Sequence, residues 1–248
     1  MSYNRRNDGF PWYLAVLIMV LFGIGNIYDT SNPSTNNSQQ VTVESTVTTS
    51  ANVLGLSASN YTGNSVAIVN NNTPYFTDSE ITTKSFEHYS DLDHLGRCGT
   101  ATACIGTDIM PTEERGSIGQ IKPTGWHTVK YSGIDGNYLY NRCHLIAYCL
   151  SGENANEKNL ITGTRYLNVE GMLPYETQVA KYMDKNPNNH VMYRATPVYA
   201  GSNLVADGVL LEAYSVEDNG KGISFCVFCY NVQPNIKIDY ATGESSKQ

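Results

Sequence analysis

The chain has 248 residues and a formal net charge of −7. With 41% hydrophobic and 16% charged residues it can bury a sizeable core, and its length favours one main domain with additional segments. Proteins that bind nucleic acid tightly and stoichiometrically usually present a basic face, so the acidic balance counts against that class. It counts less against an enzyme, which needs only a local cationic cleft and rapid product release.

Tyrosine is the dominant aromatic residue, with 18 Tyr against 6 Phe and 2 Trp. Tyr, Thr and Val suit half-buried strands, whereas the abundant Asn, Gly and Ser suit turns. We therefore predict a β-rich α+β protein: a central antiparallel sheet flanked by helices and long loops.

The first apolar segment, residues 10–28, carries no charged side chain over 19 positions. At about 1.5 Å per residue, such a helix just crosses a hydrocarbon core of about 30 Å. Arg5 and Arg6 precede it, which predicts a cytoplasmic N-terminus and an exported remainder. We predict an uncleaved signal anchor that places the main domain outside the cell membrane. A cleaved signal peptide, which would give a secreted protein, is the alternative.

Composition divides the chain into five segments. These are a cytoplasmic N-terminus (1–9), a transmembrane signal anchor (10–28), a disordered Ser/Thr/Asn-rich linker (29–60), the main domain (61–238) and a polar tail (239–248). The linker has too little apolar surface to offset the entropy of ordering it, so it is expected to be a solvated spacer. The tail is expected to be frayed.

Within the main domain, alternation and turn residues predict a series of strands and one helix. The expected strands are 65–69, 96–105, 126–131, 137–145, 190–199, 208–216 and 223–232. Residues 126–131 and 137–145 are expected to form a hairpin, and 86–95 a short helix or turn. A helix is expected after Asn168, with Pro174 in its first turn.

Residues 138–176, the central stretch of the main domain, include side chains suited to phosphodiester hydrolysis. His144 is the type of side chain best able to take a proton from water near neutral pH. The reaction also needs positive charge near the phosphoryl and leaving oxygens, which Mg²⁺ supplies with few protein ligands. The amide oxygen of Asn168 and the carboxylate of Glu176 could hold such an ion. Arg142 and Arg165 could bind phosphate.

Each residue also has a simpler structural explanation. Asn168 could cap a helix, Glu176 could be a first-turn acid favoured by the helix dipole, and Arg142 could form a surface ion pair. Eight helical residues span about 12 Å, too far for Asn168 and Glu176 to bind one ion directly unless the helix begins later. A water-mediated role for Glu176 is therefore favoured.

The sequence of residues 141–145, Asn-Arg-Cys-His-Leu, resembles the Asp-Arg-Gly-His motif of the DNA/RNA non-specific endonucleases, the ββα-metal nucleases. It is most similar to the branch of Gram-positive DNA-entry nucleases and streptodornases. The likeness covers roughly residues 66–232, including 89–97, 122–126 and 159–168, and several separated motifs occur in the right order.

The resemblance implies a ββα-metal core and an extracellular, sequence-non-specific endonuclease that cleaves DNA, with RNA as a second candidate polymer. His144 would be the general base, Asn168 the direct ligand of a hydrated Mg²⁺ (with Mn²⁺ as a substitute), and Glu176 would hold metal-bound water. Arg142 would lie near the scissile phosphate, and cleavage would leave 5′-phosphates. Further substrate contacts are assigned to Arg165, Asn141 and Lys122. The expected partners are nucleic acid and, through the N-terminal helix, a membrane; no nucleotide cofactor is expected.

Two positions depart from the family motif. Asn141 replaces the leading Asp and cannot tune a neighbouring pKa by charge, which favours an orienting role. Cys143 replaces the Gly, and a bridge from it to Cys149 would make activity redox-sensitive.

The six cysteines leave several possibilities open, because their pairing cannot be read from sequence. Cys226-x-x-Cys229 could be structural, half of a zinc site or a redox pair. The alternative functions are a catalytically degenerate, membrane-tethered binding protein on a nuclease scaffold and a CxxC redox protein.

Overall fold

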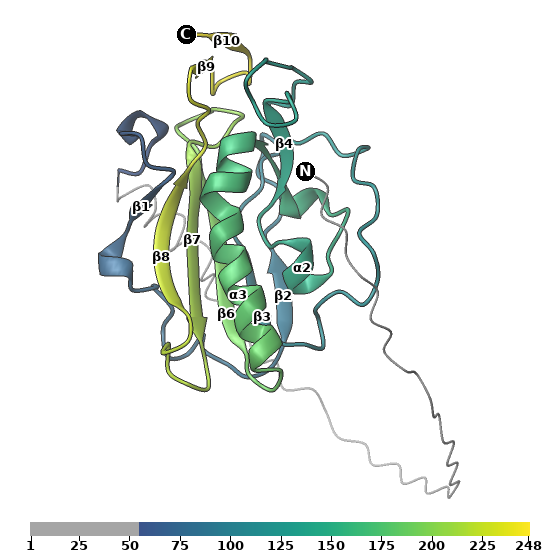
Figure 1. The fold of residues 1–248 in the computed structure, drawn as a ribbon, viewed down its shortest axis with the longest axis vertical. Coiled ribbons are helices and arrows are strands. Elements are labelled where there is room, and N and C mark those ends of the chain that lie inside the picture. Colours follow the sequence, from purple (N-terminus) through teal and green to yellow (C-terminus); the bar gives the residue numbers. More distant parts are fainter. Residues whose placement is uncertain (1–54) are drawn as a thin grey trace, which may run out of the picture. The chain divides into compact units, whose positions relative to one another are not determined.

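The computed structural model describes residues 55–248. Its centre is a six-stranded sheet, antiparallel throughout, in the order β1-β8-β7-β6-β3-β2 (Figure 1). The strands are β1 (Val66–Ile68), β2 (Phe86–Tyr89), β3 (Ala101–Ile105), β6 (Val191–Val198), β7 (Gly208–Ser215) and β8 (Ser224–Tyr230). The predicted central antiparallel sheet is confirmed.

Two small sheets and several helices complete the described part. The remaining strands are β4 (Tyr140–His144) with β5 (Leu160–Thr164), and β9 (Ile236–Ile238) with β10 (Ser245–Lys247). The helices are α2 (Tyr148–Ser151), α3 (Leu173–Lys185), the π-helical turn η4 (Leu167–Met172), and the 3-10 turns η1 (Ala58–Asn60), η2 (Asn70–Asn72) and η3 (Glu157–Asn159). Strand β4, strand β5 and helix α3 thus follow one another along the chain.

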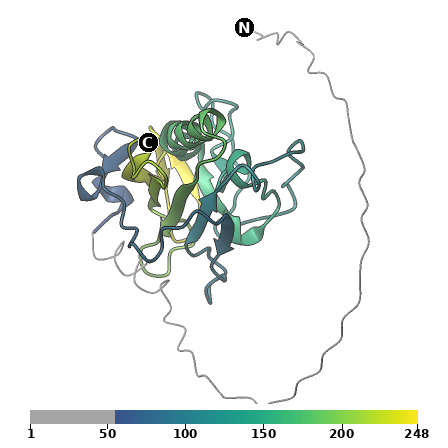
Figure 2. The ribbon, with the colours of Figure 1, turned by 90° about the horizontal axis from the view of Figure 1, so that it is seen from below.

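Helix α3 lies along one face of the large sheet, and the main hydrophobic core fills the space between them (Figures 1 and 2). Val179 and Met183, four positions apart on α3, are fully buried and form its apolar stripe. On β6, Tyr193 and Ala195 point into the same core, as the two-residue period of a strand requires. This packing fixes α3 against the sheet and holds the preceding π-helical turn beside β5.

Most predicted strands and the helix are confirmed. Helix α3 carries Pro174 in its first turn, as expected. Residues 165–185 are helical without a break, but Leu167–Met172 form a π-helical turn, so the separation estimated for an ideal α-helix from Asn168 to Glu176 does not apply.

Three expectations were wrong. Residues 86–89 form a strand rather than a helix or turn, because they pair along β3. Residues 126–131 form no strand: a single bridge joins Lys130 to Tyr138, since from Tyr140 onward the chain pairs with β5 instead. Residues after 239 are not frayed, because β10 pairs with β9.

From residue 55 onward, the structure contains no helix with the length and apolarity needed to cross a membrane. The predicted membrane segment 10–28 and most of the predicted linker lie outside the described residues.

Candidate active site

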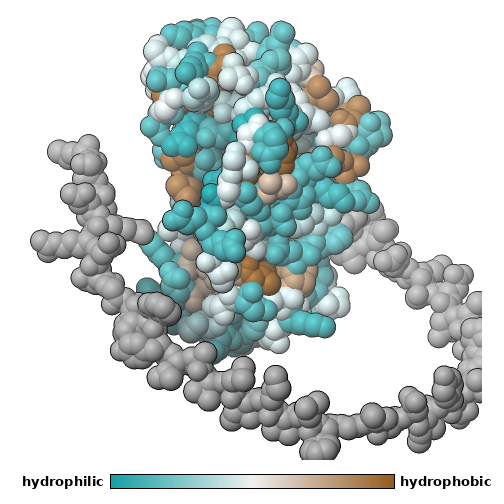
Figure 3. Space-filling view, turned by 90° about the vertical axis from the view of Figure 1, so that its right-hand side faces the viewer, coloured by the Kyte–Doolittle hydropathy of each residue, from teal (hydrophilic) through white to brown (hydrophobic). Residues whose placement is uncertain are grey.

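A cleft of about 840 Å³ lies where β4, the π-helical turn and the start of α3 meet. Six of the seven predicted site residues line it: Asn141, Arg142, His144, Arg165, Asn168 and Glu176. The seventh, Lys122, lines a different cavity of about 210 Å³. The molecular face that carries β4 and α2 is mainly hydrophilic, with small and separate hydrophobic patches (Figure 3).

His144 ends β4 with its ring in the cleft, while the preceding Cys143 points into the core. The Nε2 of His144 lies 2.8 Å from the carbonyl oxygen of Asn154. A carbonyl only accepts, so we assign the proton to Nε2, and Nδ1 then carries the lone pair. Burial of the ring lowers the pKa of His144 below its usual value, and the charge of Arg115 lowers it further, against a raising contribution from the Asn154 hydrogen bond. The neutral, proton-accepting form is therefore favoured.

Arg115 is the main site residue that the sequence prediction missed. Its Nη2 lies 3.3 Å from Nδ1 of His144, on an exposed loop that precedes β4 by more than twenty residues. No helical or strand period marks this loop, so pattern analysis could not select it. The usable signal was that Arg115 is the only arginine between Arg97 and Arg142.

Arg142 hydrogen-bonds to the backbone of the loop that carries Arg115. Its guanidinium donates to the backbone carbonyl of Gly119 at 2.8 Å and to that of Ile121, and it lies 4.0 Å from the ring centroid of Trp126. These contacts use two of its three nitrogens. Arg142 therefore holds the loop that carries Arg115 while contributing positive charge to the cleft.

Arg165 and Asn141 are joined within the cleft. Arg165 forms an ion pair with Asp135 at 2.6 Å, and its Nη1 lies 3.5 Å from Oδ1 of Asn141. The Nδ2 of Asn141 is buried with no hydrogen-bond partner in the described part of the chain. In place of the family's aspartate, Asn141 thus presents an amide that contacts Arg165 without adding negative charge.

The charge of the cleft is opposite to that of the whole chain. Three arginines, Arg115, Arg142 and Arg165, line it against the single lining carboxylate of Glu176, and one of them, Arg165, is paired with Asp135. A concave surface of one sign concentrates oppositely charged ligands. The cleft is therefore suited to an anionic polymer despite the net charge of −7.

The residues expected to hold a metal fit a hydrated, oxygen-preferring ion. Burial raises the pKa of Glu176 to about 8, with Arg115 acting in the opposite direction, and Glu176 has no ion-pair partner among residues 55–248. The side-chain amide of Asn168 makes no hydrogen bond to another described residue, and it lines the same cleft. One amide and one carboxylate suit Mg²⁺, which retains most of its water. The described residues include no group of three His, Cys, Asp or Glu side chains able to hold a metal.

All six cysteines are free thiols. Cys143 is fully buried, and Gly163 on β5 leaves room for its sulfur, since a Cβ there would collide with it. Cys226 and Cys229 are three apart on β8, so their side chains point to opposite faces and lie in different cores. The Cys143–Cys149 bridge is not formed, and the Cys226-x-x-Cys229 zinc and redox hypotheses are wrong.

Comparisons with known proteins agree with this geometry. A family model described as DNA/RNA non-specific endonuclease matches residues 72–217, more than half of the chain. A deoxyribonuclease of Streptococcus dysgalactiae subsp. equisimilis is 35% identical over 111 residues, which are 43% of this chain and 33% of that protein. The chain thus matches about a third of the length of this curated relative.

Two solved structures share the fold. NucA from Streptococcus agalactiae with magnesium bound has a TM-score of 0.67 and 28% identity, covering 79% of this chain and 94% of that one. The Sda1 nuclease with bound zinc has a TM-score of 0.62 and 25% identity, covering 75% and 97%. The chain therefore belongs to the DNA/RNA non-specific endonuclease family and has the sheet-dominated α+β fold of the NucA nucleases.

Proposed function

We propose that this chain is a magnesium-dependent, sequence-non-specific endonuclease that hydrolyses DNA, with RNA as a second polymer, and leaves 5′-phosphates. One observation carries the proposal. His144, with its Nε2 bonded to a carbonyl and Nδ1 directed at a guanidinium, shares a cationic cleft with Asn168 and Glu176.

His144 is suited to be the general base. Its Nδ1 would take the proton from the attacking water once Arg115, which lies against that nitrogen in the structure, turns to a phosphate oxygen. The Asn154 carbonyl accepts from Nε2–H, so it orients the ring and would stabilise the imidazolium that forms. Because burial and Arg115 keep the ring neutral, the base is available below the usual pKa of histidine.

The arginines are suited to hold the scissile phosphate. Arg115 lies next to the base nitrogen, so a phosphate oxygen bound there would place the attacked phosphorus beside His144. Arg165, which contacts Asn141, adds a second cation. Arg142 donates to the carbonyl of Gly119 and so stabilises the loop that carries Arg115.

Asn168 and Glu176 are the residues that would hold the metal. Asn168 would bind it through the amide oxygen, and Glu176 would accept hydrogen bonds from its water ligands. When bound, Mg²⁺ or its substitute Mn²⁺ would offset negative charge on the phosphate and on the leaving 3′ oxygen.

Export and anchoring are also part of the proposal, and their support is the sequence alone. The charge-free segment 10–28 behind Arg5 and Arg6 predicts a membrane anchor with the nuclease domain outside, or a secreted enzyme if that segment is cleaved.

A plasmid-nicking assay tests the function. Purified protein with Mg²⁺ is expected to convert supercoiled DNA to open circles and fragments, and chelation by EDTA is expected to stop it. DNA ligase should rejoin the fragments without kinase treatment, because the ends carry 5′-phosphates. Absence of cleavage with Mg²⁺ or Mn²⁺ from acid to alkaline pH would favour the binding-protein alternative.

The fall of cleavage activity at acid pH should follow the protonation of His144. His144 acts in its unprotonated form and its pKa is lowered, so kcat/KM should fall only below pH 6.5. In Arg115→Met, removal of the neighbouring charge should raise that pKa and move the acid limb to higher pH. Lys237→Met, which removes a cation on β9 outside the cleft, should leave the limb in place. An unchanged limb in Arg115→Met would contradict the assignment of His144 as the titrating base.

A further inference from the structure

Three large apolar side chains are exposed in the described part of the chain: Ile68, Tyr138 and Leu173. Isolated exposed apolar residues are common and need no explanation. Two of these three, however, line the cleft that contains His144, each with 46% of its surface exposed. Tyr138 comes from the segment before β4, and Leu173 is the first residue of α3.

The backbone holds Tyr138 in this position. The N–H of Tyr131 donates to the carbonyl of Asn137 at 2.8 Å, and that of Leu139 to the carbonyl of Val129 at 3.1 Å. Leu139 and Tyr140 are buried and fix the segment, whereas the side chain of Tyr138 is exposed. The ring is therefore presented to solvent without the entropic cost of ordering a flexible loop.

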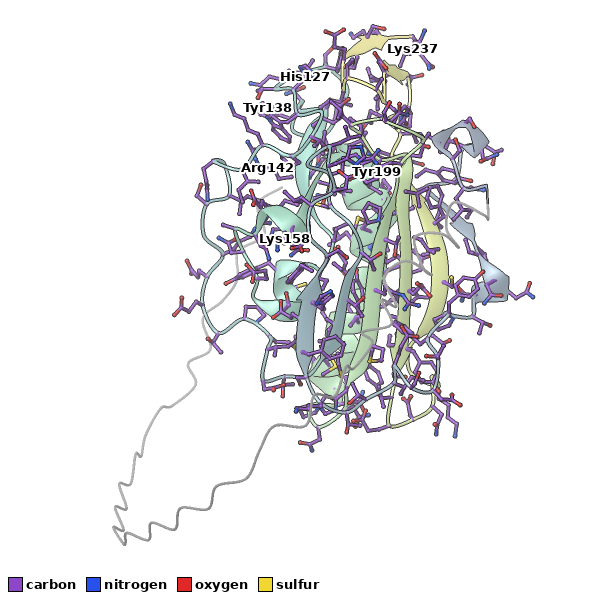
Figure 4. All side chains as sticks on the ribbon, turned by 180° about the vertical axis from the view of Figure 1, so that it is seen from behind. His127, Tyr138, Arg142, Lys158, Tyr199 and Lys237 are labelled. Carbon is purple, nitrogen blue, oxygen red and sulfur yellow. The ribbon has the colours of Figure 1, made fainter. Side chains whose placement is uncertain are left out.

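The surroundings of the ring are cationic. The Nζ of Lys130 lies 4.4 Å from the ring centroid of Tyr138, and Tyr138 projects from the same side of the described unit as Arg142 (Figure 4). Three further rings line the cleft, those of Trp126, Tyr140 and Tyr148, and all three residues are less exposed than Tyr138; the guanidinium of Arg142 covers the ring of Trp126. Lys130 lies over one face of the Tyr138 ring in the same way, but with 46% of its surface exposed Tyr138 is the most exposed ring of the cleft.

We propose that Tyr138 stacks on a base that is unpaired where the strand lies in the cleft, with Leu173 contacting the adjacent nucleotide. This inference rests on the endonuclease function proposed above and specifies how the cleft holds its substrate. In a duplex, each base face is covered by its neighbours, so an exposed ring can stack only where the strand is unpaired. Rings that stack on bases beside cations that contact phosphates are the usual means of binding single strands.

The test uses the full-length chain carrying His144→Ala, so that strands are bound without being cut. The probes are a fluorescent oligothymidylate, an oligouridylate of equal length, and a strand of the same length made of abasic sites. Tyr138→Leu keeps an apolar side chain but removes the ring, and should weaken binding of both base-bearing strands by roughly tenfold. Binding of the abasic strand should not change, because it offers phosphates without bases.

Two controls separate stacking from general damage. Tyr138→Phe keeps the ring and should bind base-bearing strands like the parent, whereas Ile68→Ala removes an exposed apolar side chain from β1, outside the cleft, and should also bind like the parent. Equal affinity of Tyr138→Leu and the parent for base-bearing strands would overturn the proposal. An equal loss of affinity for the abasic strand would also overturn it. That result would indicate that Tyr138 supports binding through a contact within the protein and not through a base.

Failure of this inference is distinguishable from failure of the proposed function. Plasmid cleavage by the unmodified chain tests the nuclease alone and does not depend on Tyr138. Cleavage with no effect of Tyr138→Leu on strand binding would remove the stacking role and retain the nuclease.

Discussion

Replacing His144 with alanine is expected to lower plasmid cleavage by roughly 10²- to 10⁴-fold, the usual contribution of a positioned general base. The loss should appear in kcat, because the histidine acts on the attacking water and makes no ground-state contact with the polymer. His94→Ala, which removes an exposed histidine outside the cleft, should retain full activity.

A second variant excludes simple misfolding as the cause. His144→Gln keeps an N–H donor for the Asn154 carbonyl but provides no base, so it should unfold near the parental temperature and still lose cleavage. Added imidazole should partly restore His144→Ala. Cleavage by either variant within tenfold of the parent would contradict the role of His144.

Replacing Asn168 with alanine is expected to have the second large effect, a loss of metal binding together with cleavage. Because Asn168 is the proposed direct ligand, its loss should lower metal affinity by more than the 10- to 100-fold typical of residues that hydrogen-bond to a metal ligand without touching the metal. Glu176→Gln, which keeps the size of the side chain, should fall within that range. Both can be measured without activity, by titration calorimetry with Mg²⁺ or by electron paramagnetic resonance with Mn²⁺.

Gln178 on α3 provides the matched control, since its amide is exposed and lies outside the cleft. Gln178→Ala should bind metal like the parent. Parental Mn²⁺ affinity in Asn168→Ala would show that the ion is held elsewhere, and the assignment of Asn168 would be wrong.

The elements with strong internal patterns were predictable from the sequence. The apolar alternation of 190–199, 208–216 and 223–232 matches β6, β7 and β8, which lie in the centre of the sheet. Helix α3 was marked by Pro174 at its start and by the Asn-rich stop after Lys185.

Elements that depend on distant pairing could not be predicted in this way. Whether residues 126–131 form a strand depends on which segment pairs with β4. The segment that does so is β5, which begins sixteen residues after the end of β4. The same applies to β10, whose polar sequence is ordered by β9.

The site was predictable where its residues lie in the central motifs. Asn141, Arg142 and His144 on β4 and Asn168 beyond β5 are brought into one cleft by the pairing of β4 with β5. Arg115 was not predictable, because only the tertiary fold places its irregular loop against His144. Lys122 illustrates the converse: closeness in sequence to the motifs did not bring it into the cleft.

The six free thiols bear on how the chain could reach its place of action. A domain whose core needs no covalent cross-link can be threaded through a membrane unfolded and can then refold on the far side without an oxidant or a disulfide isomerase. Under the export proposed above, folding of this domain would therefore not depend on the redox state of the compartment that it reaches.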